Sequence, residues 1–193
     1  FWALKYQIAA MRDSGGFDLM GGNGGTVEVD ETFWGNKKPR GQKKGRGYAH
    51  KEKILSLVER EGGRIRSYHV ERVNEATLKP ILVAQIHEDS RIMTDEAGQY
   101  CNLHKSFARH DHVSHGIGEY VRGDVHTNTV ESYYSVLKRG LTGTYHHVSK
   151  QHLKRYVGEF DFRYNYRKTD DLERTIEALR GIDGKRLYYA LPG

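Results

Sequence analysis

The chain contains the stretch Thr26-Val27-Glu28-Val29-Asp30-Glu31-Thr32-Phe33-Trp34, in which β-branched and aromatic residues alternate with polar ones. Alternation with a period of two residues predicts a β-strand with one face turned toward a core. The same stretch is unusually acidic for a strand in a chain of formal net charge +6. We therefore take Asp30, which ends the alternating run 26–30, as the first candidate site residue.

Two further acidic residues lie at the ends of predicted elements. Asp95 ends the run Ile92-Met93-Thr94-Asp95, and Glu131 follows after 35 intervening residues, near the start of a predicted helix. Ligands collect at the carboxyl ends of adjacent parallel strands, so Asp30 and Asp95 can converge there, and a glutamate on a crossing helix can join them. Mg²⁺ prefers oxygen ligands, and a pair of such ions suits the cleavage of phosphodiesters. The three carboxylates therefore predict a metal site for cutting and joining nucleic-acid backbones.

Each of these residues also has a purely structural interpretation. Asp30 and Asp95 can be ordinary turn or cap residues. Asn128-x-x-Glu131 has the spacing of a capping box, in which the glutamate reaches back to the N-cap amide. Lys138, seven residues after Glu131, shares its helix face and can contact a phosphate, or it can simply complement the helix dipole.

Charge and composition favour a polyanionic partner. The chain carries 31 Lys and Arg against 25 Asp and Glu, and residues 37–51 contain seven basic residues and no acid. Such a segment is either a solvated loop or a phosphate-contacting arm, and we favour the arm because it follows the strand that carries Asp30. The candidate DNA-binding residues in it are Lys37, Lys38, Arg40, Lys43, Lys44 and Arg46.

Other classes of protein fit the sequence poorly. One cysteine, Cys101, excludes an internal disulfide and a multi-cysteine zinc site. No apolar stretch has the length of a membrane span, and the first residues do not resemble a secretory signal. The chain begins without Met inside an apparent helix, so we expect it to be an N-terminally truncated fragment.

The order of elements predicts the fold. Strands are expected over 26–34, 53–58, 64–70, 90–95 and near 112–114, and helices over 1–13, 75–86, 128–139, 149–167 and 171–180, with a short helix after Gly98. Asn74 is expected to cap the helix over 75–86, and Gly140 to stop the one over 128–139. A hairpin meander followed by strands that alternate with helices predicts an α/β protein with a mixed sheet flanked by helices. This is the order of the ribonuclease-H-like fold, with a C-terminal helical extension.

Several motifs resemble one family. The segments Val27–Thr32, Thr94-Asp95 and His126–Glu131 resemble the signatures of bacterial DDE-type insertion-sequence transposases, nearest to the ISXO-like group. The segments 143–150 and 159–165 are similar to that family's C-terminal part. The similarity runs from about residue 24 to residue 168.

This resemblance implies a metal-dependent DNA transposase that cleaves and rejoins strands at insertion-sequence ends. Asp30, Asp95 and Glu131 would be the catalytic and metal-binding acids, holding two Mg²⁺ ions, with Mn²⁺ as a substitute. Members of the group have either Asn or Glu at the third position, so Asn128 and His126 stand as supporting residues or an alternative third ligand. Water would attack the phosphodiester in line, and the freed 3′-hydroxyl would then attack target DNA.

The same resemblance implies partners and domain limits. Transposon ends and target DNA would be bound with the help of Lys138, Arg139, Lys150 and Lys154, by a homo-oligomer in the bacterial cytoplasm. We expect an N-terminal helix remnant and glycine-rich linker over 1–25, a catalytic domain over 26–168 and a helical tail over 169–193. The alternatives are an inactive DNA-binding remnant of a truncated transposase, or another ribonuclease-H-like nuclease.

Overall fold

The computed structural model describes residues 18–35, 50–61, 63–113, 121, 123–146 and 148–182. The helix predicted over 1–13, the six basic residues between Lys37 and Arg46, and the end of the predicted tail lie outside the described residues. Within the described ranges, every helix is too short or too polar to cross a bilayer.

The centre of the fold is a five-stranded mixed sheet. Its strands are β1 (Thr26–Trp34), β2 (Glu52–Glu59), β3 (Ile65–Val70), β4 (Arg91–Asp95) and β5 (Arg109–Val113). They are arranged in the order β3-β2-β1-β4-β5. β2 is antiparallel to both β1 and β3, whereas β1, β4 and β5 run parallel to one another. β1 therefore lies at the centre, with the hairpin on one side and the parallel pairings on the other.

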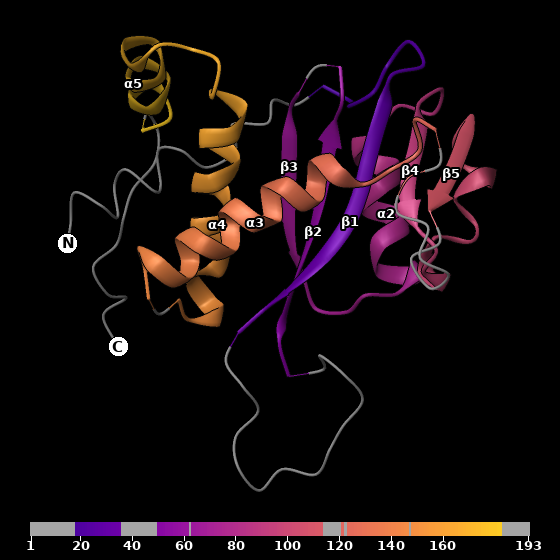
Figure 1. Cartoon of the computed structure of the whole chain (residues 1–193), viewed down its shortest axis with the longest axis horizontal. Coiled ribbons are helices and arrows are strands. Elements are labelled where there is room, and N and C mark those ends of the chain that lie inside the picture. Colours follow the sequence, from indigo (N-terminus) through magenta and orange to yellow (C-terminus); the bar gives the residue numbers. More distant parts are fainter. Residues whose placement is uncertain are drawn as a thin grey trace, which may run out of the picture.

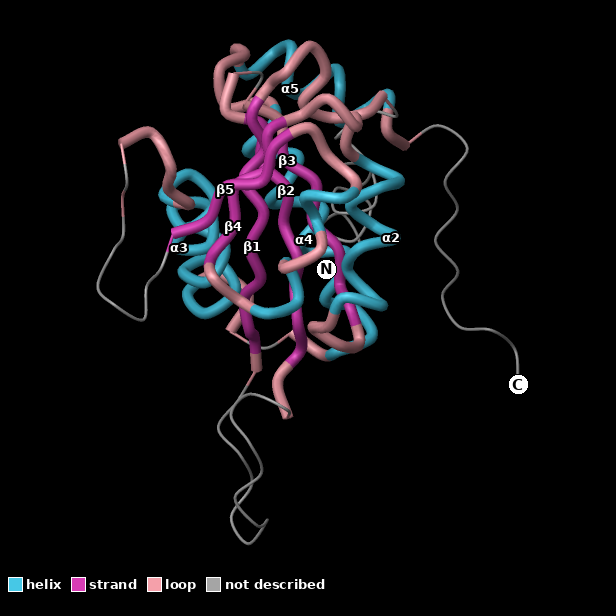
Figure 2. The backbone as a smooth tube through the Cα atoms, turned by 90° about the vertical axis from the view of Figure 1, so that its right-hand side faces the viewer, coloured by secondary structure: helices cyan, strands magenta, loops and turns pink. Residues whose placement is uncertain are grey.

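Helices cover both faces of this sheet. They are α2 (Glu75–Gln85), α3 (Asn128–Gly143) and α4 (Lys150–Asn165), with short 3₁₀ turns η1 (Gly98–Tyr100) and η2 (Leu103–Lys105). A last helix, α5 (Asp171–Arg180), lies away from the sheet and buries none of its residues. Figure 1 shows α3 crossing the sheet in front of β2 and β1. In Figure 2 the sheet is seen nearly edge-on, with α3 on one side and α2 on the other. This order of strands and helices is the ribonuclease-H-like fold, as predicted.

The alternation along β1 separates two hydrophobic cores. Val27 and Val29 are fully buried in the cluster that includes α2. Their neighbours of opposite orientation, Glu28 and Asp30, therefore face α3, whose apolar side packs with α4 in the second cluster. The strand thus presents valines to one core and carboxylates to the other side of the sheet.

Predicted boundaries shift at several places. Asn74 caps α2 as expected, accepting a hydrogen bond from the Thr77 amide at 2.9 Å. The last strand begins at Arg109, earlier than predicted. Within the predicted linker, Met20 is fully buried and pairs with Ile86 in an isolated β-bridge. This part of the linker is therefore a piece of the core.

Gly140 does not end its helix, contrary to the prediction. α3 continues to Gly143, one turn further. A Cβ at Gly140 would lie 2.1 Å from Phe160 Cζ, so glycine here allows α3 to approach the Phe160 ring of α4 closely. The glycine serves helix packing, where sequence alone suggested a stop signal.

A buried carboxylate ties these two helices to the sheet. Asp161 on α4 accepts hydrogen bonds from the Ser67 amide and hydroxyl, both at 2.8 Å, and from the Tyr133 hydroxyl at 2.6 Å. Burial raises the pKa of Asp161 to about 6, while these donors act in the opposite direction. One side chain therefore joins β3, α3 and α4.

We expect Asp161→Ala to destabilise the protein strongly. The substitution leaves buried donors of Ser67 and Tyr133 without this acceptor, and each such donor costs about 1–3 kcal/mol. The expected loss in the free energy of unfolding is about 3 kcal/mol or more, measured by urea denaturation. Asp161→Asn keeps an acceptor and the volume, so it should lose less. An Ala variant as stable as the Asn variant would contradict the role given to these bonds.

Candidate functional site

Asp30 and Asp95 belong to adjacent parallel strands. The paired residues of β1 and β4 end with Glu28 and Met93, and Asp30 and Asp95 each follow two residues later on their own strands. Residues at the same level of parallel strands point to the same face of the sheet. The sequence analysis expected the two aspartates to converge if their strands were adjacent and parallel. β1 and β4 are adjacent and parallel.

Glu131 approaches Asp30 from the helix that crosses this face. It lies in the first turn of α3, and it lines the same pocket as Asp30. The pocket has a volume of about 480 Å³. Its lining consists of Asp30, Glu31, Thr32, Phe33, Lys51, Glu131, Tyr134, Ser135 and Lys138. Two lysines thus face a cluster of carboxylates, and Lys138 shares the pocket with Glu131 as its spacing predicted.

The pKa of Asp30 is shifted by burial and by neighbouring negative charges. The pKa of Asp30 is raised to about 8, chiefly because the carboxyl is buried. Charges on Glu31, Asp95 and Glu131 add to the rise. The Glu31 amide, which donates to Asp30 Oδ1 at 2.8 Å, acts in the opposite direction. All three predicted acids are therefore close enough to interact, and their charges repel.

Glu31 is the third carboxylate in this pocket, since Asp95 lines a separate pocket with Tyr100 and His110. Sequence reasoning gave Glu31 no role. It accepts hydrogen bonds from Gln99 Nε2 at 2.6 Å and from the Tyr100 hydroxyl. Both donors belong to the turn that directly follows Asp95. Burial raises the pKa of Glu31, and the Tyr100 hydrogen bond opposes the rise. Glu31 therefore fastens the end of β1 to the segment that carries Asp95.

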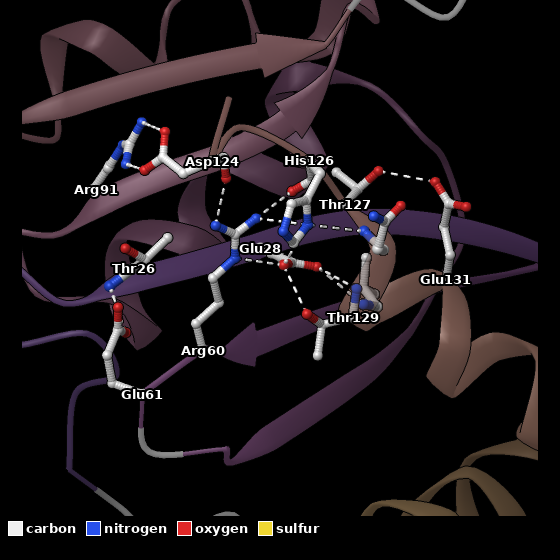
Figure 3. A network of polar contacts seen from close by, with 12 residues as sticks. Thr26, Glu28, Arg60, Glu61, Arg91, Asp124, His126, Thr127, Thr129 and Glu131 are labelled. Carbon is white, nitrogen blue, oxygen red and sulfur yellow. Dashed lines mark hydrogen bonds and ion pairs between the residues drawn. The ribbon is translucent and has the colours of Figure 1, made fainter. Parts of the chain in front are cut away.

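Glu28 is a second carboxylate without a predicted role, and its contacts contradict the alternative interpretation of Asn128-x-x-Glu131 as a capping box. The N-cap of α3 is Thr127, whose side chain makes no capping hydrogen bond. Glu28 instead accepts from the amides of Thr129 and Val130 at 2.9 and 3.1 Å (Figure 3). Glu131 accepts from the Thr127 hydroxyl at 2.9 Å. The acidity of the 28–31 stretch was the signal that could have identified both glutamates.

The two residues named as alternative ligands lie elsewhere. His126 Nδ1 is 2.8 Å from an Arg60 nitrogen and 3.4 Å from Glu28 Oε1, so its ring belongs to the entrance of α3. Asn128 does not line the pocket that holds Asp30 and Glu131. The pocket lining therefore favours Glu131 over Asn128 at the third position.

The predicted DNA-binding residues that the structure describes are exposed. Lys138 and Arg139 follow Glu131 along α3, and Lys150 and Lys154 lie in the first turns of α4. Lys150 Nζ is 3.6 Å from Glu52 and remains largely exposed. Of these four, Lys138 lines the pocket with the acids.

The donor set suits a hard divalent cation. Carboxylate oxygens are the ligands that Mg²⁺ prefers, and the raised pKa of Asp30 reports negative charge that a cation would compensate. In the part of the chain that the structure describes, no group of three or more His, Cys, Asp or Glu side chains forms a ready-made metal cage. Mg²⁺ keeps several of its waters and takes one or two carboxylates, so it does not require such a cage.

Comparison with known sequences identifies the family. The profile of the ISXO2-like transposase domain matches residues 23–165, about three quarters of the chain. The chain belongs to this family. The match spans β1, β4 and α3, so all three candidate acids lie within the ISXO2-like transposase domain.

Individual relatives agree with this assignment. An uncharacterised protein of the transposable element ISH50 from Halobacterium salinarum is 31% identical over 155 residues, which cover 72% of this chain. Those residues cover 52% of that relative, so the ISXO2-like chain spans about half the length of the curated relative it matches.

Solved structures with a similar backbone come from retroviral proteins. The HTLV-2 integrase catalytic core domain, solved in complex with magnesium, matches with a TM-score of 0.45 and 12% identity, over 72% of this chain and 85% of that chain. A simian T-cell lymphotropic virus intasome in complex with the PP2A regulatory subunit B56 gamma matches with a TM-score of 0.43 and 12% identity, over 74% and 50%. The fold of the ISXO2-like transposase domain is assigned from its own strand order.

Proposed function

We propose that this chain carries the catalytic domain of a DNA transposase, formed by residues 26–168, which cleaves and transfers DNA strands at the ends of an insertion sequence. The observation that carries the proposal is the crowding around Asp30. This half-buried carboxyl lies on the strand beside that of Asp95, shares a pocket with Glu131 and has its pKa raised to about 8. Titratable groups with strongly perturbed pKa values, gathered in a pocket, favour a catalytic site.

Asp30, Asp95 and Glu131 would hold two divalent cations, Mg²⁺ or Mn²⁺ in its place. When bound, such ions neutralise charge on the attacking and leaving oxygens and lower the pKa of water. The protein supplies position: Asp30 and Asp95 are held by paired strands, and Glu131 by the first turn of α3. Catalysis then depends chiefly on orientation and on electrostatic stabilisation.

The basic residues around this pocket would contact DNA. Lys138 lines the pocket with the acids, where its ammonium can bind a phosphate beside the scissile bond. Arg139, Lys150 and Lys154 are exposed on the helices that flank it. Phosphate contacts of this kind make affinity fall steeply with salt. The basic segment from Lys37 to Arg46 would extend the same surface, and the working complex would be a homo-oligomer on paired ends.

The proposal is tested with duplex DNA that ends in the sequence of the element. We expect strand cleavage in Mg²⁺ or Mn²⁺, loss of cleavage in EDTA and its return when the ion is restored. An Asp95→Asn protein purified in the same way controls for contaminating nucleases and should give no product. Cleavage by that variant would refute the catalytic assignment. DNA binding without any cleavage by the wild type would favour the non-catalytic DNA-binding alternative.

A further inference from the structure

A buried carboxylate on β1 holds the helix that carries Glu131. Glu28 is fully buried, and it accepts the Thr129 and Val130 amides on one oxygen. Its other oxygen accepts from the Thr129 hydroxyl at 2.8 Å and from Arg60 Nε at 2.6 Å. The first amides of a helix lack partners within the helix and attract negative charge. The cap of α3 therefore comes from a strand about 100 residues earlier in the chain.

Arg60 extends this hold to the segment that enters α3. Its guanidinium balances the charge of Glu28 and donates to the carbonyl oxygens of Asp124 at 2.6 Å and His126 at 2.7 Å. The next residue, Thr127, donates its hydroxyl to Glu131 Oε1. Figure 3 shows Glu28, Arg60 and His126 in one group of contacts, and the bond from the next residue, Thr127, to Glu131 beside it.

The position of Glu28 gives these contacts a consequence for the site. Glu28 precedes Asp30 by two residues on β1, and both face α3. An ordinary N-cap on Thr127 would stabilise the helix end without fixing where that end lies relative to the strand. A cap supplied by Glu28 stabilises the helix end and also fixes its position relative to β1. One short piece of β1 therefore sets the positions of Asp30 and Glu131.

We propose that Glu28 is a positioning residue of the metal site, which holds the first turn of α3 so that Glu131 faces Asp30. This proposal rests on the proposed function, because the site it positions is the one assigned there. Glu28 touches neither the pocket nor the DNA phosphates expected in it, and it acts through the α3 amides. Removing its charge should loosen Glu131 and leave Asp30 and Asp95 in place.

The chain offers a matched control for such a substitution. Glu59 on β2 is also a buried carboxylate, bound to an arginine, Arg64, at 2.7 Å and to the Gly21 amide at 2.7 Å. Its contacts lead to the 18–21 segment and not to α3. Glu28→Gln and Glu59→Gln therefore remove the same kind of interaction. Glu28 holds the helix that carries Glu131, whereas Glu59 holds the 18–21 segment.

The test measures Mn²⁺ binding by electron paramagnetic resonance and amide exchange in α3 by NMR. Both Gln variants should lower the melting temperature. Glu28→Gln alone should weaken Mn²⁺ binding by about tenfold or more, the usual range for residues that orient metal ligands, and should speed exchange of the first-turn amides. Thr129→Val, which removes one donor to Glu28 and leaves its charge, is the milder variant should Glu28→Gln not fold.

The outcomes separate two failures. The proposed function fails if the wild type binds no Mn²⁺, or if Asp30→Asn binds Mn²⁺ as well as the wild type does. The positioning role of Glu28 then fails with it. If wild type binds Mn²⁺ and the Glu28 variants bind it equally well, the positioning role alone is overturned. Equal weakening in Glu28→Gln and Glu59→Gln would also overturn it, since a general loss of stability would then account for the effect.

Discussion

Asp30→Asn is expected to abolish strand cleavage and, at the same time, to make the protein more stable at pH 7.5. Cleavage should fall by roughly a thousandfold or more, as is common when a group acting on the transition state is lost. Stability should rise by about 2 kcal/mol, or roughly 5 °C in melting temperature. The neutral amide removes the cost of burying a charged group and, to a smaller extent, the repulsion from Glu31, Asp95 and Glu131.

The sign of the stability change follows from proton linkage. The pKa of Asp30 is about 8 in the folded chain and 3.8 as its ordinary value. Between these values the folded state binds more protons than the unfolded state, so stability falls as pH rises through this window. The advantage of Asp30→Asn should therefore be small near pH 4 and largest above pH 8. Melting curves across this range measure it.

Metal and a control variant sharpen this prediction. Mg²⁺ binds the folded site, so it should raise the melting temperature of the wild type and leave that of Asp30→Asn unchanged. Asp111→Asn is the control on β5, because it removes ion pairs with Arg91 and Arg109 and should lower stability without ending cleavage. Should Asp30→Asn be no more stable than the wild type at any pH, the charge at Asp30 is compensated and the electrostatic account is wrong.

Glu131→Gln and Asn128→Ala are expected to differ by at least about a hundredfold in cleavage. Glu131 lines the pocket with Asp30, whereas Asn128 does not. Glutamine keeps the size of the side chain and an oxygen that can accept from Thr127, but it carries no charge for a divalent cation. Glu131→Gln should therefore lose cleavage, and Asn128→Ala should stay within a few-fold of the wild type.

DNA binding distinguishes a chemical loss from misfolding in this pair. Both variants should bind element-end DNA with wild-type affinity at the same salt concentration, measured by fluorescence anisotropy. The opposite pattern, with cleavage lost in Asn128→Ala and kept in Glu131→Gln, would show that Asn128 and not Glu131 is the third metal ligand.

The sequence predicted the sheet because strands depend on local patterns, and the same patterns suggested the three candidate acids. Alternation marked β1. Asp95 ends β4 as expected, whereas Asp30, also expected at a strand end, lies in the middle of β1. The sequence did not reveal the partners of Glu28, Glu31 and Gly140, because those partners lie far away in the chain. A glutamate in a strand carries no local sign that it will cap a helix about 100 residues later. Gly140 next to a predicted helix end likewise resembles a stop signal until Phe160 is placed against it.

The parallel pairing of β1 with β4 has a consequence for when this protein can act. Asp30 and Asp95 belong to strands that become neighbours only after the intervening hairpin and α2 have formed, and Glu131 arrives later still from the ribosome. Pairings between distant segments are slow steps of folding. If the proposed function holds, a nascent or incomplete chain would carry the acids without a working site, and DNA would meet this chemistry only after the whole domain had been synthesised and folded.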